Sequence, residues 1–235
     1  MREIDWKSQI RKFVKAPARY LLLISILAFA IGAGFAPWVY RPPVAMQLTA
    51  PGLAEYVKFL AENRLGLLPI HRLFYLLPLA TAAICLPLLA ANRQMNLHWS
   101  VNICLRAITV PLALAILSPV WSPGVLLSNE FRLQSFIAIT AIGLAIVAPF
   151  FKRLPLRWLA AVIAIAAPVS TVLALQQFWL ENDAIAATYA SPIGLGWGGW
   201  LTVFGAAGLA FSLRWLWQNS ASVRGSTNGQ QQPAH

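Results

Sequence analysis

Charged residues are scarce in this chain. Of its 235 residues, only 11% are charged and 59% are hydrophobic. A soluble domain carries about 25% charged residues. A chain this apolar would leave continuous apolar patches on a surface exposed to water. The composition therefore excludes a soluble globular protein and favours a protein that lies in a lipid bilayer.

Cysteine and histidine are also rare. The two cysteines, Cys85 and Cys104, fall inside apolar runs, so the sequence indicates no disulfide framework. The three histidines are His71, His98 and His235, which we expect at different depths and therefore not as a haem-ligating pair. No His/Cys spacing suits zinc. We expect neither a metal nor another cofactor.

Nucleotide-binding and hydrolase motifs are missing, since the chain has no G-x-G-x-x-G, no P-loop and no G-x-S-x-G. Acidic residues are missing from the long apolar segments. Proton and ion carriers usually place an acid inside a membrane span. This second absence disfavours an ion carrier.

Six long apolar segments dominate what is present. Each has 19–24 residues, which at about 1.5 Å per residue matches a hydrocarbon core of about 30 Å. We therefore predict an all-α polytopic membrane protein, a bundle of six transmembrane helices within one domain, residues 20–217. The predicted spans are residues 20–38, 73–91, 101–120, 133–151, 158–180 and 194–217.

Three flanking segments have their own character. Residues 1–19 are basic and amphipathic, which predicts a helix lying on an anionic membrane surface. Residues 51–65 predict one external amphipathic helix, because Pro51 suits a helix start and Gly66 a helix stop. Residues 218–235 are rich in Ser, Gly and Gln, which predicts a disordered cytoplasmic tail.

The charges indicate the orientation. With the N-terminus inside, the inner segments hold 13 basic and two acidic residues, and the outer segments hold five of each. The positive-inside rule then places both termini in the cytoplasm, in a plasma (inner) membrane. Membrane orientation explains the net charge of +11 better than nucleic-acid binding does. The expected partners are the lipid bilayer and other membrane protein subunits.

The polar bridge of residues 121–134 holds the main candidate site. Glu130 is a candidate general base, and Arg132 or Arg72 could hold an anionic head group. The alternative is structural, because Glu130 would suit the first turn of a helix capped by Ser128 or Asn129. Further binding candidates are Glu55, Lys58, Arg64, His71 and Gln134.

Small residues recur every four positions in the last apolar segment. Such a stripe lets helix backbones approach closely, either inside this bundle or against a partner helix. The predicted packing face consists of Gly194, Gly198, Thr202, Ala206 and Ala210.

Three functions fit these patterns. The leading hypothesis is a non-catalytic scaffold, assembly or accessory subunit of a larger membrane complex, which would not be an enzyme. The first alternative is a small-molecule transporter or channel, since prolines inside the spans could support bends. The second is an intramembrane enzyme that acts on lipid-linked substrates at the outer face.

Overall fold

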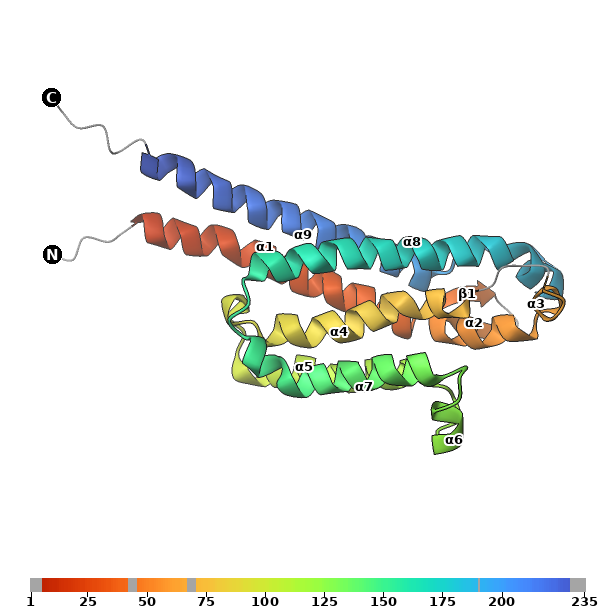
Figure 1. Cartoon of the computed structure of the whole chain (residues 1–235). Coiled ribbons are helices and arrows are strands. Elements are labelled where there is room, and N and C mark those ends of the chain that lie inside the picture. The colour runs from red at the N-terminus through yellow and green to blue at the C-terminus, as the bar shows by residue number, and fades with distance from the viewer. Residues whose placement is uncertain (1–5, 42–45, 67–70, 190, 229–235) are drawn as a thin grey trace, which may run out of the picture.

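A computed structural model of the chain describes residues 6–41, 46–66, 71–189 and 191–228. Its long elements are all helices, and they run side by side along one axis (Figure 1). These helices are α1 (Trp6–Gly34), α4 (Leu77–Ala91), α5 (Trp99–Ile116), α7 (Arg132–Val147), α8 (Leu156–Tyr189) and α9 (Trp197–Asn228).

Helix α4 lies at the centre of the bundle. It contacts α1, α5, α7 and α8, and most of its side chains are buried. A 3-10 turn, η2 (Arg72–Leu76), leads directly into it, and η3 (Arg93–Met95) follows it. The longest helices flank this core, with α9 packed along both α1 and α8.

The two ends of the bundle differ. One end carries an antiparallel pair of strands, β1 (Pro37–Arg41) and β2 (Met46–Thr49), followed by α2 (Ala50–Tyr56), η1 (Val57–Phe59) and α3 (Ala61–Arg64). We call this the hairpin end. At the opposite end, α1 begins and α9 ends, so we call it the termini end (Figure 1). The short helix α6 (Pro123–Leu126) precedes α7, and the 3-10 turn η4 (Ala148–Phe151) follows α7.

Five helical segments have the length and apolarity needed to cross a membrane. They are Pro17–Gly34, Arg72–Ala91, Trp99–Ile116, Arg132–Phe151 and Leu156–Thr188. The chain is therefore an all-α protein of the membrane-embedded class, as its composition predicts. Helix α9 is long enough to cross a membrane, but it is not one of these five segments.

Two helices extend beyond their predicted ends. Helix α1 is continuous from Trp6 and passes through Pro17, so residues 6–19 do not form a separate surface helix. Helix α9 continues to Asn228, which places residues 218–228 of the predicted tail in a helix. The stretch 218–224 has neither glycine nor proline to end it. The remaining tail, residues 229–235, lies outside the described residues.

Helix α8 also corrects the predicted boundaries. The expected loop beginning at Glu181 is helical as far as Tyr189, because residues 181–189 hold no glycine or proline. Ala184 and Ile185 bury an apolar face there and hold the helix against the bundle. Glu181 therefore lies inside a long apolar helix, contrary to the expectation that no such segment contains an acid.

The external helix predicted for residues 51–65 is broken. Thr49 caps α2 by accepting a hydrogen bond from the Gly52 amide, and the backbone becomes extended at Leu60 before α3. The Asn63 side chain donates to the Val57 carbonyl at 3.0 Å and thereby replaces a helical hydrogen bond. The two strands before it were not predicted, since each has five residues or fewer.

Helices α1 and α9 pack backbone to backbone. A Cβ atom added at Gly205 would lie 2.6 Å from the Phe29 nitrogen, and one added at Gly32 would lie 2.6 Å from the Thr202 nitrogen. Gly208 faces the Ser25 side chain in the same way. Glycine at these positions lets the two helices approach more closely than any side chain would permit.

The packing face of α9 differs from the predicted stripe. An α-helix has 3.6 residues per turn, so a four-residue repeat drifts by about 40° at each step. Gly198, Thr202 and Ala206 are buried, but Ala210 is exposed, and Gly194 is exposed and precedes the helix. The face that is buried follows alternating steps of four and three, through Gly198, Thr202, Gly205, Leu209, Ser212 and Leu216.

We predict that Gly205→Ala lowers the stability of the bundle by about 1–3 kcal/mol, because the new methyl group must displace the α1 backbone. Gly143→Ala on α7 is the matched control, since nothing lies within 4 Å of the added Cβ atom. Size-exclusion chromatography after graded heating in detergent measures the loss of folded protein. Equal resistance to heating in the two variants would contradict the close α1–α9 contact.

Candidate functional site

Four charged side chains from separate segments meet at the hairpin end. Lys58 on η1 lies between two carboxylates, with its Nζ atom 2.6 Å from Glu55 Oε2 and 2.7 Å from Glu130 Oε1. Arg72 on η2 bridges the same carboxylates, at 3.2 Å from Glu55 Oε1 and 3.5 Å from Glu130 Oε1. We call these four residues the ionic cluster. The ionic cluster connects three parts of the chain. These are α2 with the adjoining η1, the turn η2, and the turn before α7.

Arg72 makes the most contacts within the ionic cluster. Its guanidinium also donates to the Glu130 backbone carbonyl at 2.7 Å and to Gln134 Oε1 at 3.5 Å. The Phe131 ring lies under both cations, with its centroid 4.4 Å from Lys58 Nζ and 4.7 Å from Arg72 Cζ. The Arg72 side chain is only 14% exposed, so these contacts replace most of its hydration.

The electrostatics of the ionic cluster keep Glu130 ionised. A hydrogen bond from Lys58 and the positive charges of Lys58 and Arg72 hold the pKa of Glu130 below its ordinary value, against a smaller opposing effect of desolvation. A general base works best with a pKa near the operating pH. Glu130 is shifted in the other direction, which disfavours the hypothesis that it is a catalytic base.

The structure also disfavours the helix-cap interpretation of Glu130. Helix α7 begins at Arg132, its N-cap residue is Phe131, and no side chain caps it. The Ser128 hydroxyl donates instead to the Val125 carbonyl at 2.7 Å. Glu130 therefore lies before the helix, and its carboxylate contacts the ionic cluster.

The other candidates lie apart from the ionic cluster. The Arg132 side chain is exposed, and within the described part of the chain no ion pair or side-chain hydrogen bond of it is found. The exposed His71 ring lies against Phe74, at 5.1 Å between centroids. The side chain of Arg64 lies outside the described residues. Sequence reasoning thus identified all four members of the ionic cluster, together with Gln134, but not their arrangement.

A second polar group, which sequence reasoning missed, is buried behind the ionic cluster. Glu181 on α8 is fully buried, and its carboxylate accepts hydrogen bonds from the Tyr75 hydroxyl at 2.7 Å and from Gln177 Nε2 at 2.5 Å. Gln177 in turn accepts from the His71 backbone amide at 3.3 Å. The signal in the sequence was the i,i+4 spacing of Gln177 and Glu181 in a stretch that holds no helix breaker.

Neither polar group resembles a metal centre. Within residues 6–41, 46–66, 71–189 and 191–228, no three His, Cys, Asp or Glu side chains gather in a way that could hold a metal ion. No family model, curated protein or solved structure matches the chain. The function must therefore be argued from the geometry of these two groups and of the bundle.

We predict that Arg72→Gln destabilises the protein by about 1–3 kcal/mol, because Glu55 and the Glu130 carbonyl lose a charged donor in a half-buried site. Arg132→Gln makes the same chemical change at an exposed position and should alter stability by less than about 0.5 kcal/mol. Thermal unfolding in detergent, followed by tryptophan fluorescence, compares them. Equal melting temperatures would show that the ionic cluster does not hold the hairpin end.

Proposed function

We propose that this protein is a non-catalytic scaffold or accessory subunit of a larger complex in the plasma (inner) membrane. The observation that carries the proposal is the ionic cluster. Its two cations and two carboxylates neutralise one another and join three chain segments. Because these charges are already paired with one another, they suit a rigid surface at the hairpin end better than a binding site for a charged substrate.

In this proposal α9 is the sixth span, and both termini are cytoplasmic. The described ends of α1 and α9 lie at the same end of the bundle, as an even number of spans requires (Figure 1). Exposed tryptophans occur near both ends, as interfacial belts would require. Trp99, Trp158 and Trp217 are exposed near the termini end, and Trp121, Trp179, Trp197 and Trp200 near the hairpin end.

Helices α5 and α7 are the least buried of the five apolar segments and could therefore face a partner. Only 28% of the α5 segment and 33% of the α7 segment are buried, the lowest values among the five apolar segments. Cys104 on α5 is exposed, whereas Cys85 on α4 is buried. A thiol-directed reagent can therefore report on the α5 surface without any engineered cysteine.

We predict that the chain, tagged after His235 and extracted in mild detergent, migrates on native gels with stoichiometric partners that mass spectrometry identifies. A photo-crosslinker attached through Cys104 should capture one of them, and Cys104→Ser should abolish the capture. The tag should be inaccessible in intact cells, as a cytoplasmic C-terminus requires. Migration as a lone 25.7 kDa chain would contradict the scaffold proposal.

One observation favours transport as a second candidate function. Glu181 is fully buried inside a long apolar helix, and its two described hydrogen-bond donors are neutral side chains. Acidic residues in such positions often carry protons or bind cations. In this alternative, Glu181 would be the ion-binding group of a transporter.

For transport, we expect Glu181→Gln to abolish solute or proton flux in liposomes that contain the purified protein, because the amide cannot gain or lose a proton. Asp183→Asn is the matched control, since Asp183 lies two residues further along α8 and is exposed. Retention of flux in Glu181→Gln would exclude Glu181 as the ion-binding group.

A further inference from the structure

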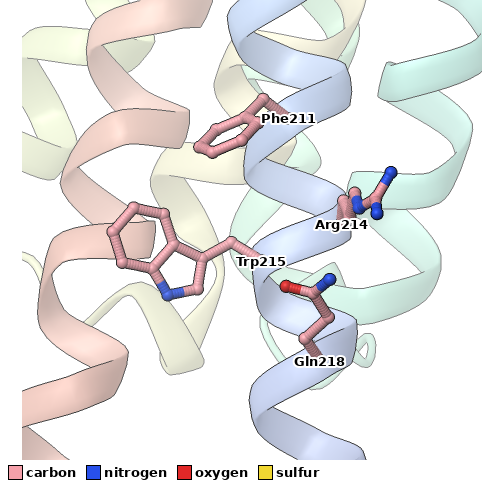
Figure 2. Close-up of a pocket in the computed structure, with 4 residues that line it drawn as sticks. All are labelled: Phe211, Arg214, Trp215 and Gln218. Atoms are coloured by element: carbon pink, nitrogen blue, oxygen red, sulfur yellow. The ribbon is translucent and has the colours of Figure 1, made fainter.

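A groove lies on α9 near the termini end, far from the ionic cluster. It has a volume of about 440 Å³ and is lined by Phe211, Arg214, Trp215 and Gln218. Figure 2 shows the two aromatic rings at the edge of α9 that faces α1 and the Arg214 side chain at the other edge, with Gln218 between them. The rings are arranged edge to face, with centroids 6.0 Å apart. The groove thus combines an apolar wall with one exposed cation.

The groove lies at the depth expected for lipid head groups. Trp217 is 55% exposed two residues beyond the groove residue Trp215, and Trp158 at the start of α8 is 69% exposed. Tryptophan prefers the boundary between head groups and acyl chains. The groove therefore opens where a phosphate and the first part of an acyl chain would meet it.

The sequences of the two helices beside the groove contain basic residues but no acidic ones. Helices α1 and α9 together carry seven basic residues and no acidic ones. In their antiparallel packing Gly208 faces Ser25, and six residues further toward the termini end this places Arg214 level with Arg19. The described acidic residues all belong to segments of the hairpin end: Glu55, Glu62, Glu130, Glu181 and Asp183. No described carboxylate competes with an anion at the groove.

We propose that this groove binds an anionic phospholipid. The Arg214 guanidinium donates to the lipid phosphate, a pairing for which its planar shape and fixed charge are suited. Phe211 and Trp215 pack against the glycerol and the upper acyl chain, which a soluble anion would lack. The assignment rests on the proposed membrane topology, which places the groove in the cytoplasmic leaflet. It holds for either a scaffold or a transporter.

The experiment measures lipid retained on the purified full-length chain. Protein in nanodiscs that contain equal amounts of phosphatidylglycerol and phosphatidylcholine, with identical acyl chains, is released into detergent and examined by native mass spectrometry. We expect the unmodified chain to retain phosphatidylglycerol preferentially. Arg214→Gln should lower that retention about tenfold, as expected for the loss of one charge-assisted hydrogen-bond partner.

Arg224→Gln is the matched control, because it removes the same charge from the same helix ten residues away. Its retention of phosphatidylglycerol should match that of the unmodified chain. Equal losses in both arginine variants would overturn the proposal in favour of a diffuse basic field, and so would the absence of any preference between the lipids. Displacement of the lipid by excess inorganic phosphate would identify a soluble anion as the ligand instead.

The folding of the variants is checked separately. Thermal unfolding of the arginine variants should match that of the unmodified chain, since both positions lie on the termini half of α9. If Arg214→Gln melts early, Arg214→Lys supplies the second test, because it keeps the charge but loses the planar donor pair. Intermediate retention in Arg214→Lys supports the site, and retention as low as in Arg214→Gln at full stability would also support it. If Arg214→Lys retains as much phosphatidylglycerol as the unmodified chain, a positive charge alone is sufficient for binding. That result would overturn the assigned guanidinium geometry.

Discussion

The structure of the hairpin end depends on the turn η2. Within five residues it places Arg72 in the ionic cluster and Tyr75 against the buried carboxylate of Glu181. The Tyr75 ring is fully buried and packs edge to face on Trp38 of β1, at 6.4 Å between centroids. One short segment thus connects the strand pair, the ionic cluster and α8. Because η2 leads directly into α4, the central helix fixes all of them relative to the bundle.

The charged side chains at the two ends of the molecule differ in burial and therefore in how their charge is compensated. At the hairpin end, charges are partly buried, and a buried charge is costly unless an opposite charge and hydrogen bonds compensate it. Lys58 and Arg72 accordingly have carboxylate partners. At the termini end, the basic side chain of Arg214 is exposed and keeps its hydration. Under the proposed topology, its compensation would come from outside the chain, from an anionic membrane surface.

The sequence was most informative where one physical rule dominates. Hydrophobic length predicted the helices, because a segment in lipid must satisfy its own backbone groups. The members of the ionic cluster were candidates for a different reason. Charged residues are rare in this chain, and we expected them to gather outside the apolar segments. The six-span count, the orientation and the membrane remain predictions.

Other predictions differ from the structure because a second physical effect decided the outcome. The boundary at Glu181 was wrong because charge was taken to end the helix, whereas Ala184 and Ile185 continue its apolar face and the absence of glycine and proline permits it. The predicted four-residue stripe has a longer period than the buried face of α9, so the two faces separate at Ala210, which is exposed. The pairing of Glu130 with Lys58 joins segments 72 positions apart in the chain, and residue patterns of short range cannot predict such a contact.

The two candidate functions make opposite demands on η2. A scaffold needs this turn to stay fixed, because it positions the ionic cluster that holds the hairpin-end surface. A transporter that used Glu181 would need access to a carboxylate that Tyr75 and Gln177 now enclose. Opening that access by moving Tyr75 would also move Arg72, three residues earlier in the same turn, and would separate it from Glu55. In a transporter, the intact ionic cluster would therefore hold η2 in a closed position. Whether η2 stays rigid distinguishes the scaffold from the transporter.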